Sequence, residues 1–122
     1  MVELLGEFFE LNLPMAVLSN KPHSYTVEIV EALFPGHLFH PVQGHEPGKP
    51  RKPDPTTALE IVQRWNLAPT EVAYVGDSSV DLETAEAARL TPLIFSWGYG
   101  TPANHHLLHS ASDLRDQVID HS

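Results

Sequence analysis

The sequence predicts an α/β fold built around a mostly parallel β-sheet. Short continuous apolar runs, typical of strands buried on both faces, alternate with stretches whose apolar residues recur at helical spacing. This alternation indicates parallel strands, because parallel neighbours are joined by crossovers that are usually helices. The 122 residues, of which 42% are hydrophobic, suit one compact domain with a modest core, so we expect a single domain over residues 1–122.

Before residue 56, the pattern predicts two helices and two strands. Asn12 and Pro14 end the helical spacing of the first helix, and Pro35 and Gly36 close the second. The first strand is a continuous apolar run, and a segment rich in Pro and Gly follows the second strand as a surface loop. The expected elements are a helix at Val2–Leu11, a strand at Met15–Leu18, a helix at Val27–Phe34, a strand at His37–Val42 and a loop at Pro41–Pro55.

From residue 56 onward, strands and helices continue to alternate. Pro55 suits the first position of a helix, where its missing N–H would have no partner in any case. The next apolar strand leads into Gly76 and Asp77, and an Ala- and Glu-rich helix follows it. The expected elements are a helix at Thr56–Trp65, a turn at Asn66–Thr70, a strand at Val72–Val75, a helix at Val80–Arg89, a strand at Pro92–Phe95, a polar loop that includes Trp97–Gly100 and a helix at Asp113–Ile119.

Composition excludes several classes of function. With 7 basic and 16 acidic residues the formal net charge is -9, which repels nucleic acid and anionic lipid, so we expect neither as a partner. The absence of cysteine excludes disulfides and thiolate zinc sites, and no acid near His105, His106 and His109 completes a metal site. No apolar run approaches the roughly 20 residues that span a bilayer, and Glu3 and Glu7 argue against a signal peptide. We therefore expect a cytoplasmic protein.

Asp77 and Asp81 are candidate metal ligands at the carboxyl end of a strand, the edge where ligands of parallel sheets gather. They form a Gly-Asp-x-x-x-Asp segment whose two carboxylates can face one point, as a hard cation such as Mg2+ requires. The simpler alternative, of about equal weight from spacing alone, is two surface acids, with Asp77 or Ser78 capping the next helix.

Lys52, Ser19 and Asn20 are candidates for holding phosphate. Prolines stiffen the backbone around Lys52, and a fixed ammonium can neutralise phosphoryl oxygens, although most loop lysines are simply solvated. Ser19 and Asn20 follow the first strand and offer hydroxyl, amide and backbone N–H groups to phosphate oxygens. Ordinary turn chemistry is the alternative for both residues.

Taken together and in this chain order, these segments resemble the haloacid dehalogenase (HAD) superfamily, especially its phosphoglycolate phosphatase-like branch. The resemblance rests on three motifs, at Ala16–Pro22, Arg51–Pro55 and Tyr74–Asp81. It implies a three-layer, Rossmann-like sheet. It also implies a hydrolase that acts on a small phosphorylated metabolite with Mg2+, through an aspartyl-phosphate.

The resemblance assigns a role to each matched residue. Ser19 would hydrogen-bond the transferring phosphoryl group with Asn20 beside it, and Lys52 would steady that group and the nucleophile. Asp77 would ligate Mg2+, and Asp81 would ligate the ion or orient its waters. We therefore expect Ser19, Lys52, Asp77 and Asp81 to converge around one cation and oxyanion.

Two parts of the family pattern are missing. The family begins with a strand that ends in Asp-x-Asp-x-Thr or Ser, whose first Asp attacks phosphorus and whose second acts as general acid and base. Neither this segment nor the substrate-selecting cap that usually follows it is in the sequence. We therefore expect a partial core domain, a fragment or a split or truncated gene product, that is inactive as this chain alone.

The missing strand also has a structural consequence. By the resemblance it would lie at the centre of the sheet, between the strand ending at Ser19 and the strand ending at Gly76. Its loss would leave unpaired backbone groups on two apolar strands. We expect the strands near Val17 and Tyr74 to pair directly, or a homodimer partner or complementing chain to cover the gap.

Two other hypotheses remain open. The missing nucleophile favours a non-catalytic HAD-like binding or assembly module, which would have kept the fold and lost the chemistry. A receiver domain, with Asp77 accepting phosphate, ranks last, since it needs further acids at an early strand end and none follows Leu18.

Overall fold

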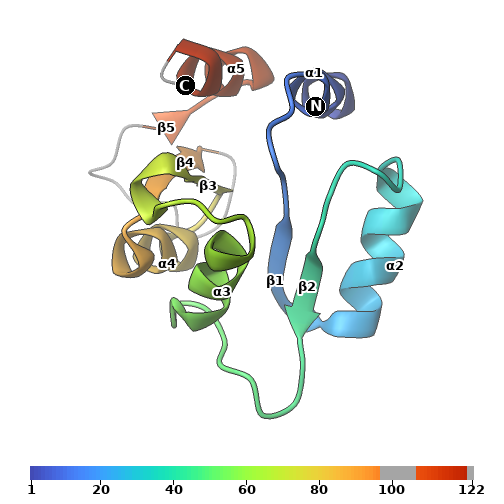
Figure 1. The fold of residues 1–122 in the computed structure, drawn as a ribbon, viewed down its shortest axis with the longest axis vertical. Coiled ribbons are helices and arrows are strands. Elements are labelled where there is room, and N and C mark those ends of the chain that lie inside the picture. Colours follow the sequence, from blue (N-terminus) through green and yellow to red (C-terminus); the bar gives the residue numbers. More distant parts are fainter. Residues whose placement is uncertain (97–106, 121–122) are drawn as a thin grey trace. The chain divides into compact units, whose positions relative to one another are not determined.

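The α/β class is confirmed by the computed structural model, which describes residues 1–96 and 107–120 (Figure 1). The chain divides into two compact units, Met1–Arg51 and Lys52–Ser122, and each unit has a parallel sheet of its own. The expected single domain over residues 1–122 stays a prediction. Within the described ranges, no helix has the length and apolar character needed to cross a membrane.

The first unit is a two-stranded parallel sheet with its crossover helix. Its elements are α1 (Val2–Glu10), β1 (Val17–Pro22), α2 (His23–Leu33) and β2 (Val42–His45). Val17 lies opposite Val42, and α2 joins the strands and packs against both (Figure 1). Leu4 and Phe8 of α1 are buried, as the helical spacing predicted.

The bounds of both strands in this unit were wrongly predicted. The strand expected at His37–Val42 begins only at Val42, because Leu38 forms a turn with Pro35 and Pro41 has no N–H to donate to a ladder. β2 instead uses residues expected in the loop. Its Gly44 approaches α2 so closely that a Cβ there would lie 2.5 Å from Thr26 Oγ1, which explains a glycine inside a strand.

β1 also runs further than expected. Its apolar part was predicted to end at Leu18, yet the strand continues to Pro22. Ser19 and Asn20 therefore lie within the strand and not beyond its end. The polar half of a strand carries no apolar signal, so the sequence pattern could not show this extension.

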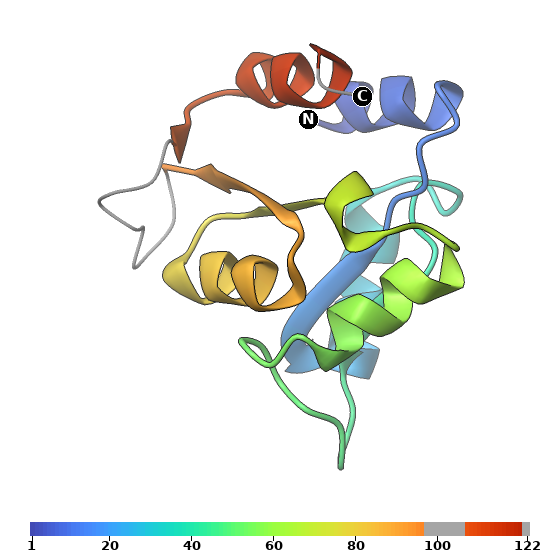
Figure 2. The ribbon, with the colours of Figure 1, turned by 60° about the vertical axis from the view of Figure 1, so that its left-hand side comes forward.

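The second unit is a three-stranded parallel sheet in the order β3-β4-β5. Helix α4 joins β3 to β4, packs against both and contacts α3 (Figure 2). Ile61, Val62, Ala85, Ile94 and Leu108 are among its buried residues. Its elements are α3 (Thr56–Arg64), a 3-10 turn (Pro69–Glu71), β3 (Ala73–Gly76), α4 (Ser79–Ala88), β4 (Thr91–Phe95), β5 (Leu107–Leu108) and α5 (Ala111–Asp120).

Most elements of this unit were predicted to within one or two residues. β5 was not predicted, because a strand of two residues is too short to show a period and it follows a polar segment of the sequence. The loop at Trp97–Gly100, together with His105 and His106, lies outside the described residues.

The expected pairing of the strands near Val17 and Tyr74 would join the two units, so it stays a prediction together with its alternative, cover of the gap by another chain. In the described residues β1 and β3 belong to separate sheets, and β3 is an edge strand with β4 as its one neighbour in that sheet. Ala73 and Val75 of β3 are exposed, Val75 by 46%, although apolar strands of parallel sheets are normally covered. An edge of this kind can accept a further strand. Cover by a homodimer partner or a complementing chain therefore stays a prediction.

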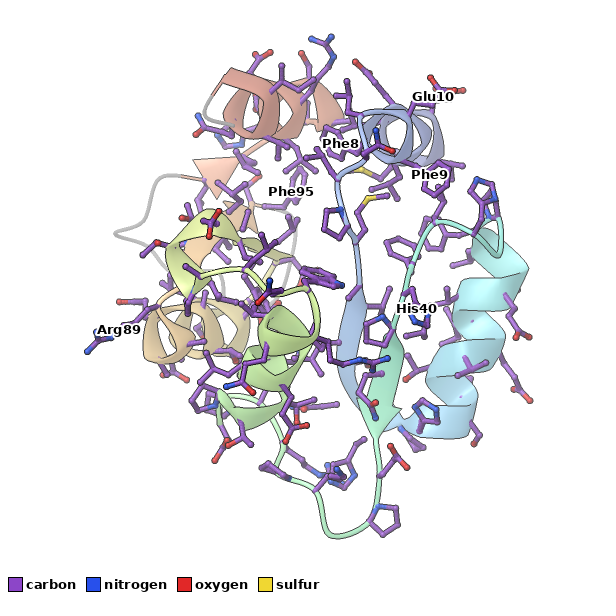
Figure 3. The ribbon with its side chains drawn as sticks, in the orientation of Figure 1. Phe8, Phe9, Glu10, His40, Arg89 and Phe95 are labelled. Atoms are coloured by element: carbon purple, nitrogen blue, oxygen red, sulfur yellow. The ribbon has the colours of Figure 1, made fainter. Side chains whose placement is uncertain are left out.

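Three helices are followed, within one or two residues, by a residue whose backbone is left-handed. Asn12 follows α1 (φ 62°) and Asn66 follows α3 (φ 57°), and asparagine tolerates this region well. Arg89 ends α4 with φ 63°, and the next residue, Leu90, donates its N–H to Ala85 O at 2.9 Å. Figure 3 shows the Arg89 side chain pointing away from the ribbon. This helix end therefore has the geometry that favours glycine, with a bulkier residue in its place.

Arg89→Gly should raise the free energy of unfolding by about 0.5–1 kcal/mol, because the left-handed penalty removed exceeds the added chain entropy. Chemical denaturation measures the change. Arg64→Gly is the matched control: it lies in the last turn of α3, where glycine should cost about 1 kcal/mol. Destabilisation by Arg89→Gly would contradict this interpretation of the helix end.

Candidate functional site

A partly buried ion pair joins Lys52 to Asp81 in the second unit. Lys52 Nζ lies 2.9 Å from Asp81 Oδ1, and the two side chains are only 14% and 11% exposed. Lys52 stands in the loop before α3, and the Thr56 N–H donates to Asp54 Oδ1 at 2.8 Å, which fixes that loop to the start of the helix. From the sequence alone, a lysine in a loop such as Lys52 is ordinarily expected to be solvated. The structure instead gives it a specific partner.

Asp81 is held by four donors. Oδ1 accepts from Lys52 Nζ and, at 3.4 Å, from the Tyr74 hydroxyl. Oδ2 accepts from the Asp77 N–H at 3.0 Å and the Ser78 hydroxyl at 3.1 Å. Ser78 is also the N-cap of α4, where it accepts the Asp81 N–H at 3.3 Å. Since a carboxylate offers about four lone-pair sites, Asp81 is fully occupied in this arrangement.

The pKa of Asp81 is lowered by these partners. Burial by itself raises the pKa of a carboxyl, but the hydrogen bond and charge of Lys52, with the Asp77 N–H and the Ser78 hydroxyl, outweigh that cost. Asp81 is therefore an anion at neutral pH, and it compensates the charge of Lys52.

Tyr74 and Gly76 place β3 beneath the ion pair. They are two residues apart on a strand and so lie on one face. A Cβ at Gly76 would overlap the Asp81 carboxylate, so only glycine admits this approach. Burial, and then the charge of Asp81, raise the pKa of Tyr74, which keeps its hydroxyl protonated as a donor.

Asp77 differs from Asp81 in its surroundings. It is exposed, and its carboxylate takes part in no hydrogen bond or ion pair in the part of the chain that the structure describes. Its oxygens are thus available to a cation. Among residues 1–96 and 107–120 no three His, Cys, Asp or Glu side chains gather as a metal site. A single exposed carboxylate supplies oxygen donors, the ligand type that Mg2+ takes in proteins.

Ser19 and Asn20 belong to the first unit. Ser19 Oγ accepts the Lys21 N–H at 3.1 Å, a local hydrogen bond between side chain and backbone. Their convergence with Lys52, Asp77 and Asp81 stays a prediction. The described histidine of the C-terminal loop, His109, forms a 2.9 Å hydrogen bond between its Nδ1 and Ser96 Oγ.

The sequence prediction missed Tyr74 and Ser78 as partners of the ion pair. A Ser-x-x-Asp spacing at the start of a helix indicates a capping arrangement, and this signal could have linked Ser78 to Asp81. Nothing comparable pointed to Tyr74, because an aromatic residue in a strand is usually core.

Gly76→Ala should destabilise the chain by about 1–3 kcal/mol, because the added methyl group displaces the Asp81 carboxylate from Lys52. Thermal and chemical denaturation measure the loss. The control is Gly6→Ala, in α1, where no atom lies within 4 Å of the new Cβ and alanine should stabilise the helix by about 0.5–1 kcal/mol. Equal effects of the two substitutions would show that Asp81 does not depend on Gly76.

Known proteins resemble this chain in sequence. A family model described as haloacid dehalogenase-like hydrolase matches residues 1–94. The chain is 30% identical over 120 residues to a phosphoglycolate phosphatase of Photobacterium profundum, covering 97% of this chain and 52% of that protein. It is 31% identical over 97 residues to a phosphoglycolate phosphatase of Escherichia coli, covering 80% and 38%. The chain thus spans about half the length, or less, of these relatives.

Solved structures show the same fold. A proposed phosphoglycolate phosphatase from Lactobacillus delbrueckii superposes with a TM-score of 0.86 at 27% identity, covering 96% of this chain and 51% of that one. A HAD-superfamily hydrolase from Ehrlichia chaffeensis gives 0.82 at 24% identity, covering 98% and 56%, and at that identity it supports the fold alone. Since the family model matches well over half of the residues, the chain belongs to the haloacid dehalogenase-like hydrolase family.

Proposed function

We propose that this chain is part of a phosphoric monoester hydrolase that acts on a small phosphorylated metabolite. The observation that carries the proposal is the Lys52–Asp81 ion pair, at 2.9 Å, in the same unit as the exposed carboxylate of Asp77. Phosphoryl transfer depends mainly on positioning and on charge stabilisation, and this arrangement offers a fixed cation and an available anion. The similarity to phosphoglycolate phosphatases supports the same reaction class.

Asp77 would hold Mg2+ in this proposal. When bound, the ion would neutralise phosphoryl oxygens as a Lewis acid. Asp81 would take part indirectly, since its oxygens already accept from four groups and a direct metal bond would displace one of them. Two roles were expected for Asp81, ligating the ion or orienting its waters. The second role fits this occupancy better than direct ligation.

Lys52 would stabilise the negative charge of the transferring phosphoryl group. A lysine on a flexible stem does this best when its ammonium is already fixed, and Asp81 fixes it here. Ser19 and Asn20 remain the proposed phosphate-binding residues of the first unit, through their hydroxyl, amide and backbone N–H groups.

The nucleophile would come from polypeptide outside these 122 residues. The sequence has no Asp-x-Asp-x-Thr or Ser segment, and the relatives it matches are about twice as long. We propose that an aspartate of such a segment forms the aspartyl-phosphate. The segment would belong to a complementing chain or to a longer form of this protein, and its strand would cover the exposed edge of β3.

In an NMR titration, the 122-residue chain should bind Mg2+ and inorganic phosphate weakly. Asp77→Asn should weaken the Mg2+ affinity by at least about tenfold, because it removes the available carboxylate. The control is Asp116→Asn, an exposed acid on α5. Purified chain should hydrolyse an aryl phosphate negligibly.

Two results would contradict the proposal. Aryl phosphate hydrolysis at an ordinary enzyme rate, lost in Asp77→Asn, would show that no outside nucleophile is needed. Absence of binding to both Mg2+ and phosphate would favour a non-catalytic binding or assembly module, the alternative that the missing nucleophile already favours.

A further inference from the structure

Tyr74 of β3 contacts both members of the ion pair. Its hydroxyl donates to Asp81 Oδ1 at 3.4 Å, and Lys52 Nζ lies 5.9 Å from the centre of its ring. We infer that Tyr74 is a positioning residue of the phosphoryl site, which acts through Lys52 and Asp81 and not on the substrate. This inference rests on the proposed function.

The hydroxyl restricts the carboxylate. Asp81 Oδ1 is shared by Tyr74 and Lys52, while Oδ2 is held by the backbone and the Ser78 side chain at the start of α4. Loss of the hydroxyl would leave Oδ1 with Lys52 as its one remaining donor among the hydrogen bonds described above. The carboxylate could then rotate, and the ammonium would follow it.

The ring restricts the lysine. A lysine has four rotatable side-chain bonds, and Lys52 stands in a loop, so each contact of the ammonium adds to its restriction. An aromatic ring about 6 Å from a cation attracts it through the ring quadrupole, and more strongly when the site is partly dry. Tyr74 supplies that ring from β3, whose residue 74 is paired with Pro92 of β4. The ion pair is thereby tied to a strand as well as to a helix.

The rival explanation is that Tyr74 only fills the core. Core filling depends on the ring, so Tyr74→Phe would preserve it, whereas the positioning role needs the hydroxyl as well. Tyr74→Leu removes both features. The molecule also offers a matched control in Tyr25, which is 51% exposed and whose ring centre lies at the same 5.9 Å from Lys21 Nζ.

The test compares the chain with Tyr74→Phe, Tyr74→Leu and Tyr25→Phe. Nitrogen-15 NMR of the lysine side chains measures how fast the Lys52 and Lys21 ammonium hydrogens exchange with water, and a titration measures binding of inorganic phosphate with Mg2+ present. In Tyr74→Phe, exchange at Lys52 should be faster, and phosphate affinity lower, by about 3- to 10-fold, the effect of one hydrogen bond. Tyr74→Leu should exceed Tyr74→Phe in both readouts, and Tyr25→Phe should change neither.

Circular dichroism tests whether each variant is folded. If Tyr74→Leu does not fold, Tyr74→Phe alone decides the question. The inference is overturned if Lys52 exchange is unchanged in folded Tyr74→Phe. It is also overturned if Tyr25→Phe changes Lys52 exchange and phosphate affinity as much as Tyr74→Phe does. If the unmodified chain binds neither Mg2+ nor phosphate, the proposed function fails. Faster Lys52 exchange in Tyr74→Phe would even then uphold the positioning of the ion pair by Tyr74.

Discussion

The second unit is organised around one buried electrostatic constraint, the ion pair between Lys52 and Asp81. Removing two charges from water costs more free energy than their mutual attraction returns, unless further hydrogen bonds satisfy both groups. Here Tyr74, Ser78 and the Asp77 N–H complete the Asp81 carboxylate, and Gly76 leaves room for it. The pair therefore fixes the loop before α3 against the first turn of α4, and the value of this constraint lies in its geometry more than in net stability.

The alternation of apolar runs and helical spacing predicted the α/β class and most elements, because burial imposes those periods directly. β2 was misplaced, since Pro41 and Gly44 are signs of a loop in sequence but here flank or occupy a strand. β5 is too short to have a period. The pattern could not predict which strands are neighbours, because pairing joins segments that lie far apart in the chain.

Lys52 and Asp81 were predicted as site residues from their residue type and their position near strand ends. The structure places the two side chains together. Spacing could not show that Asp81 is enclosed by donors while Asp77 is exposed, because four residues of sequence fix neither side-chain rotamers nor the approach of β3. The same limit hid Tyr74. The exposed Val75 on β3 also depends on the strand being at an edge, which composition does not reveal.

A double-mutant cycle with Lys52→Met and Asp81→Asn, measured by chemical denaturation, tests the central constraint most directly. At pH 7 the coupling energy should be about 1.5–3 kcal/mol, as for a hydrogen bond between charged groups. Because the pKa of Asp81 is lowered when folded, the coupling should be complete above the ordinary value of 3.8 and should fade as the pH falls through the folded value. A coupling energy below about 0.5 kcal/mol at pH 7 would show that the two residues act independently and would contradict this role of the pair.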